Sequence, residues 1–172
     1  MKFKKLTYSP KIPTLTLTMI EEKEYTLVFV FKGEEVLLGM KKRGFGVGKW
    51  NGFGGKIEKG ETNEEGAKRE LHEESSLIAN TLQRVGYLVF NMKESAKLMK
   101  VHVYRTDDFS GSPMESEEMK PKWYSVDNIP YDGMWPDDKY WIPYMLDGKT
   151  LIGRFDYEDD DTISDYTVKE QG

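Results

Sequence analysis

The segment "KRELHEESS", Lys68–Ser76, holds three glutamates, Glu70, Glu73 and Glu74, at spacings of three and four residues. Those spacings place the three side chains on one face of a helix, where like charges repel and destabilise the helix. A solvated acidic surface is one explanation for the cluster. A site for a hard cation is the other, because Mg²⁺ prefers carboxylate oxygens and a bound cation turns the repulsion into attraction.

The cluster lies in a predicted helix, Thr62–Ser75. Thr62 and Glu65 have the spacing of a capping box, in which each side chain accepts a hydrogen bond from the backbone N–H of the other residue. Ala67 and Leu71 fall on one side of the helix, which we expect to face the core. The glutamates therefore lie beside the buried stripe rather than opposite it.

The spacing upstream of the glutamates matches a long pattern. Gly55 is followed by five residues, Glu61, seven residues and then RELHEESSL. This arrangement resembles the Nudix box, Gly-x5-Glu-x7-Arg-Glu-apolar-x-Glu-Glu-x-Gly-apolar. Ser76 stands where the box has glycine. We expect that position to follow the helix, where glycine eases a left-handed turn, so serine costs some stability but removes no ligand. The fixed positions of the box are filled by Gly55, Glu61, Arg69, Glu70, Leu71, Glu73, Glu74 and Leu77.

The resemblance to Nudix hydrolases implies an α/β fold in which a mixed β-sheet is sandwiched between helices. It also implies hydrolysis of a nucleoside diphosphate linked to another group, with Mg²⁺ as the cofactor and Mn²⁺ as a substitute. The implied metal ligands are four carboxylates and a main-chain carbonyl: Gly54, Glu70, Glu73, Glu74 and Glu118. One of the same glutamates would act as the catalytic base, and the sequence does not choose among them. Glu61 and Arg69 would hold the loop and helix in register.

Two stretches outside the box bear on the substrate. Leu37–Lys56, "LLGMKKRGFGVGKWNGFGGK", and Met134–Trp141, "MWPDDKYW", resemble the branch of the family that hydrolyses oxidised purine nucleoside triphosphates to monophosphates and pyrophosphate. Three alternatives stay open: a Nudix hydrolase of capped RNA, ADP-ribose or inositol pyrophosphates; a non-catalytic nucleotide-binding module; and an interaction protein that displays an acidic helix.

The second stretch carries adjacent carboxyl groups, Asp137 and Asp138. Plain helix-dipole complementarity would explain them if they stood alone. In a closed pocket, however, two neighbouring carboxyl groups need not both ionise, and the protonated one can donate a hydrogen bond. Together with the amide of Asn51, which both donates and accepts, such a pair can recognise the edge of an oxidised guanine or adenine.

Aromatic, methionine and basic residues complete the predicted nucleotide site. Trp135 would stack on the base, while the aromatic and methionine side chains could equally belong to the core, and Lys41 could be an ordinary surface lysine. The predicted substrate contacts are Thr26, Lys41, Phe45, Asn51, Phe53, Gly54, Gly55, Lys56, Phe90, Met99, Met119, Trp135, Pro136, Asp137 and Asp138.

Apolar, β-rich runs predict six strands around these motifs. The glycine-rich segment Lys42–Lys56 is predicted to be a loop or a broken strand, a second helix is predicted to start at Pro136, and the acidic tail Glu158–Gly172 is expected to be loosely held. The predicted strands are Tyr25–Phe31, Val36–Lys41, Leu82–Met92, Leu98–Thr106, Met119–Val126 and Thr150–Tyr157.

Composition sets the remaining limits. The first 18 residues are basic and acid-free, and we expect a disordered or targeting arm at 1–18 before a single domain at 19–172. A formal net charge of -5 argues against a nucleic acid polymer as partner. No apolar run approaches the length of a membrane span. The chain has no cysteine, which suits a reducing compartment. We expect a monomer that acts on a small nucleotide in the cytoplasm, with mitochondrial and nuclear pools as alternatives.

Overall fold

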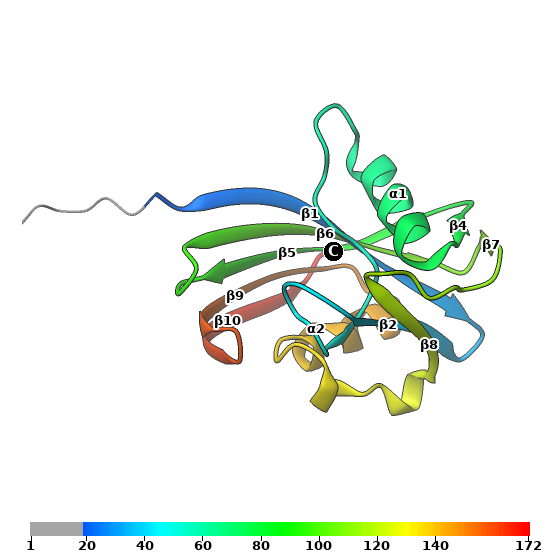
Figure 1. The fold of residues 1–172 in the computed structure, drawn as a ribbon. Helices are drawn as coiled ribbons and strands as arrows, with labels where there is room; N and C mark the ends of the chain where they lie inside the picture. The colour runs from blue at the N-terminus through cyan, green and yellow to red at the C-terminus, as the bar shows by residue number, and fades with distance from the viewer. Residues whose placement is uncertain (1–18) are drawn as a thin grey trace, which may run out of the picture.

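The fold is a mixed β-sheet with α1 on one face and α2 on the other (Figure 1). The computed structural model describes residues 19–172, so the arm expected at 1–18 lies outside the described residues. Eight strands form the main sheet, in the order β10-β9-β5-β6-β1-β2-β3 with β8 paired to β2. The elements are β1 Glu21–Lys32, β2 Glu35–Lys41, β3 Trp50–Asn51, α1 Asn63–Ser75, β4 Ile78–Ala79, β5 Gln83–Met92, β6 Lys97–Thr106, β7 Phe109–Ser110, β8 Met119–Ser125, the 3₁₀ turns Val126–Asn128 and Tyr131–Gly133, α2 Asp138–Leu146, β9 Leu151–Asp159 and β10 Thr162–Glu170.

Strand β1 explains the two-sided core. Successive side chains of a strand point to opposite faces, and the run Val28, Phe29, Val30, Phe31 is buried throughout. Val28 and Val30 pack in the cluster under α1, whereas Phe29 and Phe31 pack in the cluster that contains Trp141 of α2. A continuous apolar strand therefore supplies both layers. Because β1 pairs parallel with β6 and antiparallel with β2, the prediction of a mixed sheet between helices is confirmed.

The segment Phe53–Lys56 follows the edge of β1 that β2 leaves free. Strand β2 pairs with β1 only over Val30–Lys32, and beyond that point Phe53 exchanges backbone hydrogen bonds with Val28, at 2.7 and 2.9 Å. Gly54 approaches β1 so closely that a Cβ there would lie 1.8 Å from the carbonyl oxygen of Thr26. Only glycine fits that contact.

Helix α1 begins and ends as its sequence predicts. Thr62 is the N-cap, and it and Glu65 form both hydrogen bonds of the capping box. Ala67 and Leu71 are fully buried. The helix ends at Ser76, whose φ of 65° puts it in the left-handed region, so this serine adopts the conformation that the box reserves for glycine.

Two boundary predictions are wrong. The tail expected to be loose at Glu158–Gly172 contains β10, which pairs along β9. The sequence did not predict this strand because acidic residues surround its few apolar ones. In the structure, Ile163 and Val168 pack against the core and Tyr166 stacks on Phe155. Helix α2 begins two residues after the predicted Pro136, because Pro136 lies in a turn closed by a backbone hydrogen bond from Asp138 to Trp135. Within residues 19–172 no helix has the length and apolarity to cross a bilayer.

Replacing Ser76 with glycine is expected to stabilise the fold by about 1 kcal/mol, because the left-handed conformation strains a side-chain-bearing residue and not glycine. Chemical denaturation measures the change in the free energy of unfolding. Ala96, whose φ is 52°, is a matched second site where glycine should act in the same direction. A loss of stability at both positions contradicts this explanation.

Candidate active site

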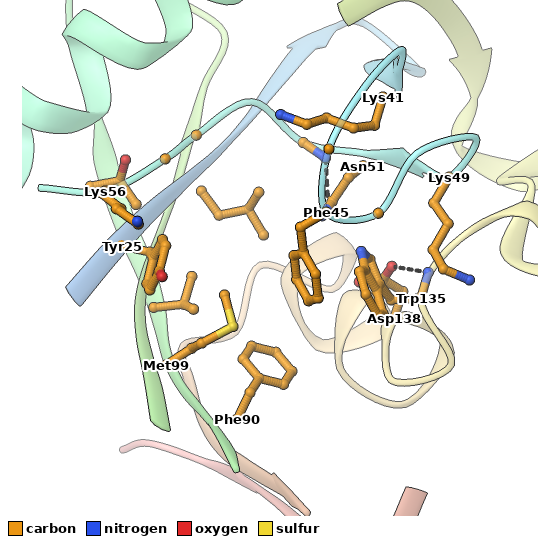
Figure 2. Close-up of a pocket in the computed structure, with 18 of the residues that line it drawn as sticks. Tyr25, Lys41, Phe45, Lys49, Asn51, Lys56, Phe90, Met99, Trp135 and Asp138 are labelled. Atoms are coloured by element: carbon orange, nitrogen blue, oxygen red, sulfur yellow. Dashed lines mark hydrogen bonds between the residues drawn. The ribbon is translucent and has the colours of Figure 1, made fainter. Parts of the chain in front are cut away.

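A cavity of about 550 Å³ opens among β1, the glycine-rich segment, strands β5 and β6, and the start of α2. It brings together residues that lie far apart in the sequence, several of which Figure 2 draws around the open space. Fifteen residues predicted to form the site line the cavity: Thr26, Lys41, Phe45, Asn51, Gly54, Gly55, Lys56, Glu74, Phe90, Met99, Glu118, Met119, Trp135, Asp137 and Asp138.

One end of the cavity is aromatic. The rings of Phe45 and Trp135 lie 4.8 Å apart between centroids, and Phe90 and Met99 face the same space from β5 and β6 (Figure 2). Lys49 Nζ lies 5.1 Å from the centre of the Trp135 ring. Flat aromatic faces with a polar rim suit a stacked heterocyclic base.

The two aspartates have different surroundings. Asp137 accepts hydrogen bonds from Trp141 Nε1, at 2.8 Å, and from the Tyr157 hydroxyl. Asp138 accepts one from the backbone N–H of Trp135, at 3.1 Å (Figure 2). Burial raises the pKa of both carboxyl groups, and the neighbouring charge of Asp137 raises the pKa of Asp138 further. The pair therefore favours one proton shared between two carboxyl groups.

Two more polar residues line the cavity. Asn51 Oδ1 accepts the N–H of Gly52 at 2.8 Å, which orients the amide, and its nitrogen has no protein partner within residues 19–172. The hydroxyl of Thr26 is buried and likewise finds no hydrogen-bond partner in that part of the chain. An unpartnered buried hydroxyl such as that of Thr26 is costly, whereas Asn51 is half-buried and its amide nitrogen is available to a ligand.

Glu118 lies among cations. Lys41 Nζ is 3.1 Å from Glu118 Oε2, and Arg43 Nε donates to the other oxygen. The Arg43 guanidinium, followed by the Lys41 ammonium, holds the pKa of Glu118 below its usual range. This carboxylate is therefore kept ionised.

Glu74 is the buried carboxylate of the site. Its side chain accepts the N–H of Gly54 at 3.1 Å, and the residue is 6% exposed. Burial raises the pKa of Glu74 to about 7, because removal from water disfavours the charged form more than the Gly54 hydrogen bond favours it.

Arg69 organises the remaining box residues. Its guanidinium pairs with both oxygens of Glu61, at 2.6 and 2.9 Å, with Glu70 at 2.8 Å and with Glu73 at 3.2 Å. It also donates to the carbonyl oxygen of Lys56 at 3.1 Å, which joins the helix to the loop. The hydrogen bonds from Arg69 lower the pKa of Glu61 to about 2.

The match to the NUDIX domain model spans residues 23–145. The chain belongs to the Nudix family. It is 52% identical over 152 residues to the oxidized purine nucleoside triphosphate hydrolase of Mus musculus. The aligned residues cover 88% of this chain and 97% of that protein. It is 48% identical, with the same coverage, to the protein of that description from Danio rerio. The fold is similar to the crystal structure of a MutT protein from Bacillus halodurans, with a TM-score of 0.77 and 26% identity over 86% of this chain and 97% of that one.

Nudix hydrolases generally use divalent metal ions, and the residues present fit one. Burial raises the pKa of Glu74, and it raises the pKa of Glu70 in spite of the ion pair with Arg69, so at both carboxyl groups desolvation outweighs the nearby positive charge. A Cβ at Gly55 would lie 2.5 Å from the Glu70 carboxyl carbon, which shows how closely backbone and carboxylate approach. Within residues 19–172 no three acidic or histidine side chains converge as a ready-made metal cluster; Arg69 pairs with box carboxylates instead.

Four predicted residues lie off the cavity wall. Phe53 is fully buried in the core under α1, because its side chain points to the opposite side of the loop from the cavity. Glu70 and Glu73 lie beside Arg69, and Pro136 lies in the turn before α2.

Among the lining residues that sequence reasoning missed, four have side chains that pair with or lie against predicted site residues. Arg43 and Lys49 lie within the glycine-rich segment Lys42–Lys56, and their positive charge among so many glycines was a usable signal. Trp141 follows Asp137 by four residues, a helical spacing that could have indicated contact. Nothing in the sequence around Tyr157, on the last predicted strand, indicated that it belongs to the site. Only the pairing of β9 with β5 brings it to the cavity.

Replacing Glu74 with glutamine is expected to change how stability depends on pH and on divalent cations. The pKa of Glu74 is raised from 4.5 to about 7 in the folded state. The stability that this group contributes is therefore fully present below about pH 4.5 and is lost as the pH rises through about 7. In metal-free buffer, the melting temperature of the wild type should fall relative to Glu74→Gln over that range.

Adding Mg²⁺ at pH 7.5 should raise the melting temperature of the wild type more than that of Glu74→Gln, because a ligand that binds only the folded state stabilises it. Glu64→Gln, an exposed change on α1 paired only with Lys68, is the matched control and should behave like the wild type. Identical pH and Mg²⁺ responses in all three proteins would refute the role of Glu74.

Proposed function

We propose that this protein hydrolyses oxidised purine nucleoside triphosphates to nucleoside monophosphates and pyrophosphate, and so removes damaged precursors from the nucleotide pool. One observation carries the proposal: a single cavity joins an aspartate pair and Trp135 at one end to Glu74, Glu118 and the glycine loop at the other. The two Nudix relatives at about 50% identity, described as hydrolases of this class, support it.

The base would bind at the aromatic end. Trp135 offers a face for stacking, and the aspartates and Asn51 offer donors and acceptors for the purine edge. Because the aspartate pair shares one proton, it can present a donor at one carboxyl group and an acceptor at the other. A site that pairs with specific edge groups rejects analogues that leave its buried polar atoms unpaired.

The triphosphate would extend toward the glycine loop. Lys41 and Lys56 line that part of the wall and offer positive charge to phosphate oxygens. The proposed ligands of the cation are Glu70, Glu73, Glu74 and Glu118 with the Gly54 carbonyl. When bound, Mg²⁺, or Mn²⁺ in its place, neutralises phosphate charge and lowers the pKa of water.

The two carboxylates on the cavity wall suit different tasks. Glu74, whose pKa is raised to about 7, can accept a proton from an attacking water near neutral pH, where general bases work best. Glu118 is held ionised by Arg43 and Lys41, which suits a fixed negative charge rather than proton transfer. Environments that push the pKa values of neighbouring carboxyl groups apart commonly separate such roles. We therefore assign Glu74 as the base. We also propose that the water attacks the α-phosphorus, so that pyrophosphate is the leaving group.

We further propose that the chain acts as a cytoplasmic monomer on free nucleotides. Its cysteine-free composition suits a reducing compartment, and its net charge of -5 disfavours a polynucleotide partner.

A substrate panel tests the proposed function. In the presence of Mg²⁺, pyrophosphate release should be faster with 8-oxo-dGTP and 2-hydroxy-dATP than with dGTP or dATP, and EDTA should abolish it; methylated guanine nucleotides complete the panel. Glu74→Gln should lower kcat by on the order of 100-fold, the usual contribution of a general base.

Glu64→Gln again serves as the control and should retain wild-type kcat. Hydrolysis of ADP-ribose in preference to every purine triphosphate would contradict the proposed substrate class. A near wild-type kcat for Glu74→Gln would contradict the assignment of the base and leave the substrate class standing.

A further inference from the structure

Tyr157 is a buried polar residue of the cavity wall that neither the box nor the proposed chemistry uses. It lies on β9, is 1% exposed and lines the cavity. Its hydroxyl accepts the backbone N–H of Asp137 at 3.2 Å and donates to Asp137 Oδ1. The Asp137 N–H thus donates to the Tyr157 hydroxyl oxygen, and the single proton of that hydroxyl is donated to the Asp137 carboxylate.

Asp137 is therefore surrounded by donors. Tyr157 donates to one carboxylate oxygen and the Trp141 indole N–H donates to the other. An indole N–H can only donate, so that oxygen cannot carry a proton directed at Trp141. Hydrogen bonds of this kind favour the ionised form, and they lower the pKa of Asp137 against the effect of burial.

Asp138 has fewer protein partners. The Trp135 N–H donates to Oδ2 at 3.1 Å, and the nearby Trp141 indole lowers the pKa of Asp138 less than burial and the charge of Asp137 raise it. Burial and the adjacent charge of Asp137 raise its pKa well above the usual range. Asp138 is thus the member of the pair whose surroundings suit the protonated form.

Other charged or titratable groups near the pair do not reverse this order. Lys49, from the glycine-rich segment, lowers the pKa of Asp138 only as a minor influence, and it also pairs with Asp161 at 3.0 Å. Tyr131, before α2, has a pKa raised by burial and by the charge of Asp138. Neither group makes a hydrogen bond to Asp137, so Tyr157 is the titratable residue in direct contact with it.

We propose that Tyr157 is a positioning residue that fixes the one proton of the aspartate pair on Asp138 and thereby narrows which purine edge the cavity accepts. This inference rests on the proposed function, because it concerns the same base-recognition end of the cavity.

The chemistry of purine edges gives the selectivity. A 6-oxo group accepts a hydrogen bond, so the carboxyl group that faces it must be protonated. A 6-amino group donates, so the same carboxyl group must be ionised and the proton must move to its neighbour. A proton moved onto Asp137 would meet the Tyr157 hydroxyl and the Trp141 indole N–H, which both donate to that carboxyl group and favour its ionised form. Tyr157 therefore favours one of the two edges over the other.

Changing Tyr157 to phenylalanine tests the inference, since it removes the hydroxyl and keeps the ring. The quantity to measure is the kcat/KM of the better of 8-oxo-dGTP and 2-hydroxy-dATP divided by the kcat/KM of the poorer. In Tyr157→Phe this ratio is expected to shrink roughly tenfold, which is the effect of losing a hydrogen bond to a charged group. Because that bond favours ionised Asp137, its loss should also move the acid limb of monophosphate binding, which does not need the base Glu74, to higher pH by about one unit.

A double-mutant cycle separates positioning from general damage. In an Asp137→Asn background, Tyr157→Phe should change neither the ratio nor the pH profile, because the group through which it acts is gone. Tyr166→Phe, the same change at an exposed position on β10, is the matched control and should leave both quantities at their wild-type values.

Dissociation constants of the two corresponding monophosphates, measured by calorimetry, give the same ratio without hydrolysis. A wild type that binds both monophosphates but hydrolyses neither triphosphate contradicts the proposed function alone. An unchanged ratio and an unchanged acid limb in folded Tyr157→Phe overturn the role of Tyr157 and leave the proposed function intact. Additive effects in the double-mutant cycle also overturn it.

Discussion

The contact between Phe53–Lys56 and β1 is the constraint on which the rest of the site depends. Three backbone hydrogen bonds, between Phe53 and Val28 and from Thr26 to Gly55, fix this seam at 2.7 to 2.9 Å. Gly54 approaches β1 too closely for any side chain, and from that position its N–H reaches Glu74. Strand β2 pairs with β1 only over Val30–Lys32, so Phe53–Lys56 takes the place of β2 beside the part of β1 that lines the cavity.

Burial of carboxyl groups is the second theme, and it occurs at both ends of the cavity. At the phosphate end, Glu74 is desolvated whereas Glu118 is held by cations, and their pKa values move in opposite directions. At the base end, Asp137 collects donors whereas Asp138 faces the cavity. In each pair the fold keeps one group ionised and the other close to protonation, which is the arrangement that proton-dependent recognition and catalysis require.

Much of this architecture could be predicted from the sequence, for reasons that differ from element to element. The apolar run around Val28 and Phe29 predicted a central strand because burial on both faces leaves no polar positions. The capping box predicted the start of α1, and the box glycine position predicted the left-handed turn at Ser76. Local chemistry is enough at such positions.

The remainder depended on contacts between distant segments. Tyr157 reaches Asp137 only because β9 pairs with β5, and Arg43 reaches Glu118 only because β8 pairs with β2. Strand β10 was overlooked because its acidic residues face outward and conceal two apolar positions. Phe53 points into the core under α1 rather than into the cavity. This direction depends on which side of the loop contacts β1, and no local sequence pattern specifies that side.

Binding of Mn²⁺, followed by the loss of the free-ion electron paramagnetic resonance signal, tests most directly whether the seam on β1 builds the metal site. The wild type should bind Mn²⁺ near its carboxylates, and Gly54→Ala, which forces the loop away from Thr26, should weaken binding at least tenfold while circular dichroism reports an intact fold. Equal affinity in a folded Gly54→Ala protein would contradict the account.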